Sequence, residues 1–249
     1  MDLTQVGVLS LAAFAAGAIN GVAGGGTLIT FSALLAAGLD PRQANATSTV
    51  ALWPGTLGAV VAGHADLPAG RPLLLRLALP CFVGGLIGSI LLLKTPSTWF
   101  EAFIPWLILF ATVLFAFQQG VQHVSRRTMP GPLVALFQLG VGIYGGYFGA
   151  AIGILTLAAL SFLGERHLPR ATAVKNVLVA LINGVAVVVF GVSGLVQWQT
   201  ALAMTLASIL GGYQGVRLAR RLGPRTNRAL VVGIGIAVVA WTLWRNLSR

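Results

Sequence analysis

The sequence predicts an all-α integral membrane protein built from two homologous repeats. Hydrophobic residues make up 57% of the 249-residue chain and charged residues only 8%, whereas a soluble domain carries roughly a quarter charged residues. Apolar runs near twenty residues recur along the chain, which is the length that a helix needs to cross a bilayer. Glycine, proline and arginine recur in the same order in both halves, which indicates a duplication.

Eight apolar runs are expected to form the helices of one membrane domain. They cover residues 5–37, 41–63, 72–93, 101–119, 132–163, 171–191, 198–216 and 228–246. Asp40 and Pro41, followed by Gln43, supply a cap, a first-turn proline and an N3 partner for the second run. Thr98 and Glu101 form a capping box that is expected to open the fourth run.

The first and fifth runs are about thirty residues long, too long for one span of roughly twenty and too short for two spans with a turn. Glycines interrupt both runs near the middle, at Gly24–Gly26 and at Gly145, Gly146 and Gly149. We therefore expect each run to form a broken helix pair, for which a re-entrant hairpin is one possible shape.

The evidence for the duplication is a set of matching glycine, proline and arginine residues, which rarely match by chance between apolar helices. Three closely similar shifts align the halves, of 125, 128 and 127 residues in turn. They place Gly17, Gly21 and Gly24 on Gly142, Gly146 and Gly149, then Pro41, Arg42 and Gly63 on Pro169, Arg170 and Gly191, and then Gly84, Gly85 and Gly88 on Gly211, Gly212 and Gly215. The first repeat is placed at residues 1–120 and the second at 121–249, each with a broken helix pair and three membrane-spanning helices.

The positions of the 16 basic residues favour an inverted arrangement of the repeats. If both broken runs return to their own side, twelve basic residues share one face, a better positive-inside division than the ten-to-six split with eight simple crossings. The other face then holds Arg42, Lys94, Arg245 and Arg249. Three crossings and a hairpin in each half place both termini in the periplasm. Inverted repeats with paired broken helices are typical of transporters that bind their substrate at the midplane.

Two stretches of each half resemble the TauE/SafE sulfite exporter family. Residues 21–28 (GVAGGGTL) with 41–49 (PRQANATST) resemble its first-repeat signature, and residues 142–153 (GIYGGYFGAAIG) with 171–176 (ATAVKN) resemble its second. The resemblance covers essentially the whole chain and implies transport of sulfite, thiosulfate or an organosulfonate. Two departures, Ala150-Ala151 opposite Gly25-Gly26 and Lys175-Asn176 opposite Thr47-Ser48, argue against strict twofold symmetry of the site.

An anion at mid-membrane needs fixed hydrogen-bond donors, and a broken helix offers free backbone N–H groups at the positive end of a dipole. Gly24, Gly25 and Gly26 allow close approach to such groups, and Thr27 adds a hydroxyl at the new helix start. The same glycines also match small-residue packing spacing, which is the alternative interpretation.

A second group of candidates lies two turns into the helices that follow the breaks. Thr47 and Ser48 are neutral donors that could instead bond to their own helix. Lys175 and Asn176 hold the equivalent place, where Lys175 either binds the anion or extends to the headgroups. Secondary candidates are Asn20, Tyr144, Tyr147 and Asn183, each expected to serve first as an interhelical polar contact, and Gly149 of the second break.

The remaining charged and reactive residues narrow the function. The five acidic residues, Asp2, Asp40, Asp66, Glu101 and Glu165, all lie at or beyond run ends, so no carboxylate is expected to bind sodium or relay protons within the bilayer. The sequence predicts no metal or cofactor site and no enzymatic site, since His64, His123 and His167 fall in expected loops without ligand spacing and no catalytic motif is present. No nucleic-acid partner is expected, because the basic residues follow the positive-inside rule. We expect an inner-membrane exporter of a small sulfur anion; uptake of an organosulfonate, an anion channel and a non-transporting membrane adaptor are the alternatives.

Overall fold

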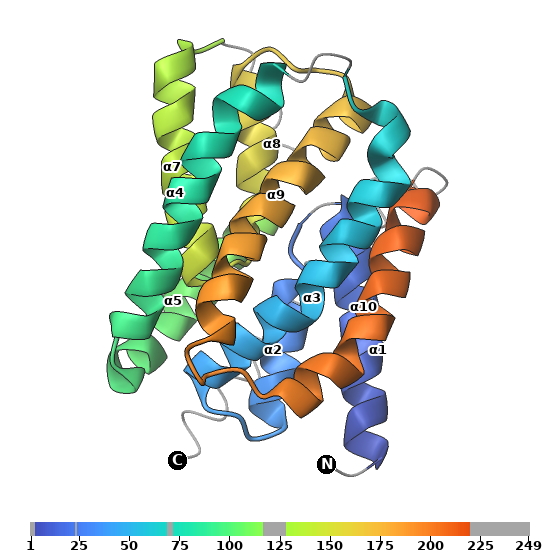
Figure 1. Cartoon of the computed structure of the whole chain (residues 1–249), viewed down its shortest axis with the longest axis vertical. Coiled ribbons are helices and arrows are strands. Elements are labelled where there is room, and N and C mark those ends of the chain that lie inside the picture. Colours follow the sequence, from blue (N-terminus) through green and yellow to red (C-terminus); the bar gives the residue numbers. More distant parts are fainter. Residues whose placement is uncertain (1–2, 23, 69–71, 117–127, 220–249) are drawn as a thin grey trace.

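The computed structural model describes residues 3–22, 24–68, 72–116 and 128–219, and these residues form helices joined by short connections (Figure 1). The expected run at 228–246 lies outside the described residues. A single 3-10 turn, His64–Asp66, follows the third helix. The helices are α1 (Leu3–Val22), α2 (Thr27–Ala36), α3 (Pro41–Gly63), α4 (Pro72–Lys94), α5 (Ser97–Ala116), α7 (Gly131–Tyr147), α8 (Ile152–Phe162), α9 (Leu168–Gly191) and α10 (Trp198–Ala219).

The surface of these helices is that of a multi-pass membrane protein. Four described helices are long and apolar enough to cross a membrane, over Thr4–Val22, Leu74–Lys94, Ser97–Leu114 and Leu168–Gly191. Large apolar side chains stand exposed on the outer faces, among them Leu11, Leu75, Trp106, Val188 and Leu206. A soluble monomer rarely exposes so much apolar surface, and lipid is the medium that accepts it.

Each of the two long apolar runs folds as a pair of helices, as the sequence predicted. α1 and α2 are separated by residues 23–26, and α7 and α8 by residues 148–151. In Figure 1 the α1–α2 pair begins and ends at the lower end of the molecule, while the α7–α8 pair begins and ends at the upper end. Neither pair crosses the whole molecule, so the breaks of both lie at its middle.

The helices pack as two groups that each combine both halves of the sequence. α10 packs along α1 and α3, and these three helices form the first bundle. α4 packs along α7 and α9, which together form the second bundle. The bundles meet where α3 contacts α9, at the centre of Figure 1. Trp53 of α3 joins them there by donating its indole N–H to Ala180 O at 2.9 Å.

Glycines allow the backbones within each bundle to touch. In the first bundle a Cβ on Gly211 or Gly215 would collide with the carbonyl oxygens of Phe14 or Ala18. In the second bundle Gly84 and Gly88 face the carbonyls of Leu139 and Ile143 in the same way. Leu139 and Ile143 stand 125 positions after Phe14 and Ala18, so residues that the sequence aligns make matching contacts.

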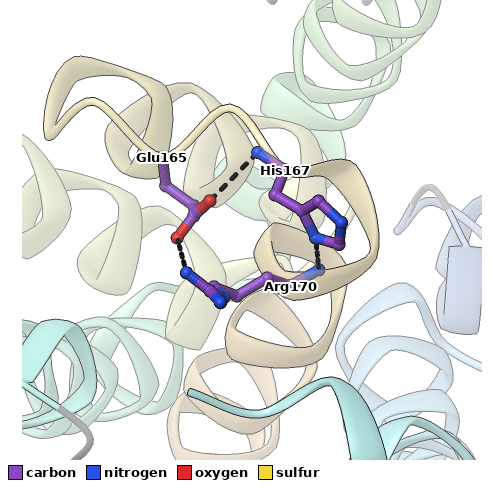
Figure 2. A network of polar contacts seen from close by, with 3 residues as sticks. All are labelled: Glu165, His167 and Arg170. Atoms are coloured by element: carbon purple, nitrogen blue, oxygen red, sulfur yellow. Dashed lines mark hydrogen bonds and ion pairs between the residues drawn. The ribbon is translucent and has the colours of Figure 1, made fainter. Parts of the chain in front are cut away.

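The starts of α3 and α9 depend on side chains that accept hydrogen bonds from the first turn. As expected, Asp40 Oδ1 accepts from the backbone N–H groups of Arg42 and Gln43, at 3.0 and 3.4 Å. At α9, His167 Nδ1 accepts from Arg170 N at 3.4 Å. Glu165 supports this cap, as Figure 2 shows. Its carboxylate accepts a hydrogen bond from His167 N at 3.0 Å and lies 4.0 Å from the Arg170 guanidinium.

The expected cap at Thr98 is wrong. α5 already begins at Ser97, and Phe100 N donates to Pro96 O at 3.0 Å, so Thr98 lies within the first turn. Proline has no backbone N–H to donate, but its carbonyl can accept the first hydrogen bond of a helix. The helix can therefore start directly after Pro96, before Thr98 could act as a side-chain cap.

The second break contains a left-handed residue that is not glycine. Ala151, the residue before α8, has φ 63°, whereas its aligned position Gly26 has φ −59°. Ala151→Gly should raise the free energy of unfolding by about 1 kcal/mol, because glycine adopts this conformation without the Cβ clash. Thermal unfolding in detergent should show a rise of a few degrees. Ala150→Gly is the matched control and should lower the midpoint, since Ala150 does not have a positive φ.

The glycine contacts make a second prediction about stability. Gly88→Ala should destabilise the protein by about 1–3 kcal/mol, since the new Cβ overpacks α4 against the α7 backbone. Gly140→Ala on α7 is the control, because a Cβ there meets nothing within 4 Å, and it should be neutral or slightly stabilising. Equal unfolding midpoints for the two variants in detergent would show that close helix approach does not contribute to stability.

Candidate functional site

The two breaks lie against each other. A Cβ on Gly24, which has φ +85°, would lie 2.5 Å from Gly153 Cα and 2.9 Å from Gly153 N. A Cβ on Gly149 would lie 4.0 Å from Thr27 Cγ2. Four helix ends therefore converge: the C-termini of α1 and α7 and the N-termini of α2 and α8. We take this crossing of the breaks as the candidate site.

The C-terminus of α1 is capped by α9, a helix of the other bundle. Lys175 Nζ donates to the carbonyl oxygens of Asn20, Gly21 and Val22, at 3.0, 3.3 and 3.4 Å. Asn176 Nδ2 adds a hydrogen bond to Gly21 O at 3.2 Å. These are among the last carbonyls of α1, which have no partner within the helix and form the negative end of its dipole.

Lys175 therefore does not extend to the headgroups. Its side chain is 0% exposed, and its three ammonium donors all point to α1. Of the two roles that the sequence left open, the membrane-surface role does not fit this geometry. The ammonium instead lies within the protein beside the first break, where it places a positive charge.

The C-terminus of α7 is capped in the corresponding way from α3. Asn45 Nδ2 donates to Tyr147 O at 3.0 Å. Asn45 is buried, and its Oδ1 has no hydrogen-bond partner among the described residues. Sequence reasoning did not select Asn45, because its aligned position is Ala173 and the repeat offers no polar counterpart. Its place in the 41–49 motif, two residues before Thr47, was the available signal.

The electrostatics of the crossing suit an anion. The N-termini of α2 and α8 supply partial positive charge, and the Lys175 ammonium offsets the negative end of α1. Of the acidic residues of the described chain, Asp40 and Glu165 lie in connections, Asp66 lies in the 3-10 turn, and Glu101 is exposed near the start of α5. The described part of the crossing thus combines helix N-termini and a cation with no carboxylate.

The glycines of the first break have packing roles as well. A Cβ on Gly26 would run into the Ala16 backbone, and Gly24 contacts Gly153 as described. Gly24, Gly25, Gly26 and Thr27 are all buried. Gly26 N donates to Asn20 Oδ1 at 2.7 Å, so one donor of the α2 start is already occupied.

The other primary candidates separate in space. Ser48 Oγ lies 2.6 Å from Thr30 Oγ1 on α2, one turn after Thr27. Thr47 Oγ1 instead accepts from Gln197 N at 3.0 Å, just before α10 begins. The structure thus brings Lys175 and Asn176 to the first break and Ser48 to the helix that follows it, while Thr47 contacts the α9–α10 connection.

The secondary candidates surround the breaks unevenly. Asn20 lies in the last turn of α1, directly before the first break, and Gly149 lies in the second break with φ +80°. Tyr147 donates its hydroxyl to Thr95 Oγ1 at 3.4 Å, and the buried hydroxyl of Tyr144 has no partner among the described residues. Asn183 is buried on α9, two turns beyond Asn176.

An aromatic cluster beside the second break was not anticipated. Phe148, within this break, makes edge-on ring contacts with Phe31 at 5.4 Å, Phe100 at 6.5 Å and Tyr144 at 6.4 Å between centroids. These rings come from α2, α5 and α7, so they share no spacing that a sequence pattern could reveal. They close one side of the crossing with apolar surface.

Known proteins resemble this chain over almost its whole length. The family model described as sulfite exporter TauE/SafE matches residues 9–242. The probable membrane transporter protein YfcA of Escherichia coli K12 is 31% identical over 242 residues, which cover 96% of this chain and 90% of the relative. The probable membrane transporter protein ORF9 of Sinorhizobium sp is 30% identical, covering 92% and 89% of the two chains.

A further relative is the probable membrane transporter protein of Haemophilus influenzae, 28% identical over 246 residues that cover 96% of this chain and 95% of its own. No solved structure gives a significant match. The family is one of transporters and not of enzymes. The chain, which forms a multi-pass membrane protein with two broken helix pairs, therefore belongs to the TauE/SafE sulfite exporter family of membrane transporters.

Proposed function

We propose that this protein is a secondary transporter that exports a small sulfur-containing anion of the sulfite, thiosulfate or organosulfonate class across the bacterial inner membrane. The observation that carries the proposal is the crossing of the breaks. There two helix N-termini meet beside the Lys175 ammonium, which is 0% exposed, and the described residues supply no carboxylate. Such a site favours an anion over a cation. The description of the family as sulfite exporters supports an anion that contains sulfur.

The burial of the site supports a carrier in preference to an open channel. The residues at the crossing, among them Gly24, Ser48 and Asn176, are buried in this state. Some helix movement must therefore expose them to either side. Because the two bundles each combine both halves of the chain, we propose that the first bundle rocks against the second, rather than one half against the other.

Inverted repeats, with boundaries at residues 1–120 and 121–249, belong to the same proposal. The matching glycine contacts of the two bundles support them, as do the opposite directions from which the broken pairs enter in Figure 1. Together with the twelve-to-four division of basic residues, they support the proposal that both termini lie in the periplasm.

The orientation can be tested with fusions to Arg249. Alkaline phosphatase fused there should be active. Green fluorescent protein fused at the same position should stay dark, because it would reach the periplasm unfolded. Fusions at Arg126, which the proposal places in the cytoplasm, should behave in the opposite way. A bright fluorescent fusion at Arg249 would contradict the inverted topology.

The described part of the crossing has no carboxylate to bind a coupled cation, and from this we predict the driving force of transport. Moving one charge through 100 mV is worth about 2.3 kcal/mol, which is roughly a fiftyfold gradient. An inside-negative potential can therefore expel an anion without a coupled cation. Sulfite efflux from proteoliposomes should accelerate as an inside-negative potassium–valinomycin potential is increased, and sodium should have no effect.

Efflux that ignores the potential and follows a sodium or proton gradient would contradict this mechanism. Efflux that saturates with sulfite concentration separates a carrier from a channel. Empty liposomes and liposomes with an unrelated membrane protein are the controls. Comparing the transport rates of sulfite, thiosulfate and taurine in the same vesicles would rank the candidate substrates. Net uptake that is faster than efflux under both signs of the membrane potential would favour the uptake alternative.

A further inference from the structure

Asn20 joins the two helix ends at the first break. Its side-chain Oδ1 accepts a hydrogen bond from Gly26 N at 2.7 Å, and its backbone carbonyl accepts the shortest hydrogen bond of Lys175, at 3.0 Å. Gly26 directly precedes α2, so its N–H is one of the donors that the start of this helix offers to an anion. In this structure the acceptor at Gly26 N is an amide oxygen of the protein, a group that an oxyanion can replace as hydrogen-bond acceptor.

The two helix C-termini at the crossing are held unequally. Lys175 and Asn176 make four hydrogen bonds to the end of α1. At the end of α7, Asn45 makes one. The cation is present at one of two ends that the sequence repeat makes equivalent, because the position aligned with Lys175 is Thr47, which contacts Gln197. The strong link joins α1 of the first bundle to α9 of the second.

Lys175 cannot leave these carbonyls without a replacement. A bare ammonium in a buried, apolar setting costs several kcal/mol, and the uncapped carbonyls of α1 would cost more. A negatively charged ligand is the partner that could draw the ammonium away. The position most suited to that ligand is the Gly26 amide, which Asn20 links to Lys175 through a single residue.

Resting on the anion transport proposed above, we propose that Asn20 and Lys175 form a latch that the transported oxyanion opens. In the empty protein Asn20 Oδ1 occupies the Gly26 amide, and Lys175 ties α1 to α9. An entering oxyanion displaces Asn20 Oδ1 from Gly26 N, and the resulting shift of Asn20 and the negative charge of the anion release Lys175 from the α1 carbonyls. Lys175 then pairs with the anion, and the two bundles are free to rock.

The latch has a kinetic consequence. An empty carrier still has its two bundles tied by Lys175, so its return across the membrane is slow. A loaded carrier has exchanged this tie for the anion and moves faster. Exchange of sulfite for sulfite should therefore outpace net sulfite efflux.

The first test measures sulfite affinity at Asn20. Asn20→Ala removes the competing oxygen at Gly26 N, so sulfite should bind about tenfold more tightly in a calorimetric titration of the purified protein. Ser208→Ala is the control, since it removes one buried hydrogen bond between helices, from Ser208 Oγ to Ala51 O at 2.6 Å, at a position outside the crossing, and its affinity should match the wild type. If Asn20→Ala does not fold, Asn20→Leu fills the space without the oxygen. Unchanged or weaker binding in the Asn20 variant would overturn the latch.

The second test measures the ratio of sulfite exchange to net efflux in proteoliposomes. At saturating sulfite the wild type should show a ratio of several-fold, and Lys175→Met should bring it close to one, because the empty carrier is no longer tied more strongly than the loaded one. Lys175→Arg, which keeps the charge and the donors, should retain a ratio above one. A wild type that moves no sulfite would refute the proposed function. A wild type that transports with a ratio of one, or a ratio unaffected by Lys175→Met, would refute the latch alone.

A third measurement needs no Lys175 variant and so covers the case in which Lys175→Met does not fold. Hydrogen–deuterium exchange of the wild type should quicken several-fold in the last turn of α1 when sulfite replaces chloride, since the end of this helix loses its cap. The Gly26 amide should stay protected, because the anion replaces Asn20 Oδ1 as its acceptor. Exchange in the last turn of α1 that sulfite leaves unchanged or slows would contradict release of Lys175.

Discussion

The backbone of a broken helix must be satisfied inside the membrane, and the centre of this protein is organised around that requirement. Lipid offers no hydrogen bonds, so each free N–H or C=O group at a helix end within the bilayer costs several kcal/mol unless the protein supplies a partner. Lys175 and Asn176 supply donors to the end of α1, and Asn45 supplies one to the end of α7. The breaks are tolerated because each is capped by a helix of the opposite bundle.

This crosswise capping follows from how the bundles are composed. Backbone contact at glycines joins α10 to α1 and α4 to α7, so each bundle holds helices from both halves of the chain. α3 and α9 are then left to meet at the centre and to extend polar side chains to the break of the other bundle. The small residues that fix the packing thereby also decide which polar groups reach the candidate site.

The same arrangement explains how the crossing can suit an anion, as proposed, without many charged residues. The ends of α2 and α8 provide partial positive charge that costs no charged side chain, and one ammonium balances the opposing end of α1. Strict symmetry is absent, because Lys175 stands opposite Thr47 and Ala151 adopts the left-handed conformation opposite Gly26. An asymmetric cap gives a transporter a means of treating its empty and loaded states differently.

The sequence by itself determined that the protein lies in a membrane and where its described helices and two breaks fall, because these properties depend on local features. Run lengths, the cap at Asp40 and the interruption at Gly24–Gly26 are properties of neighbouring residues, and they predicted α3 and both broken pairs. The candidates Lys175 and Asn176 were also found, since polar residues stand out in apolar runs. Thr98 was misassigned, because the helix could start one residue before it, at Ser97 after Pro96.

Only the tertiary structure decided which partners these residues have. It showed that Lys175 caps α1, that Thr47 contacts the connection before α10, and that Asn45 and Phe148 belong to the crossing. These contacts join residues that are about 100 to 155 positions apart, as between Asn45 and Tyr147 or Asn20 and Lys175. No local periodicity encodes such a pairing, because it depends on which helix faces which after the glycine contacts have set the two bundles.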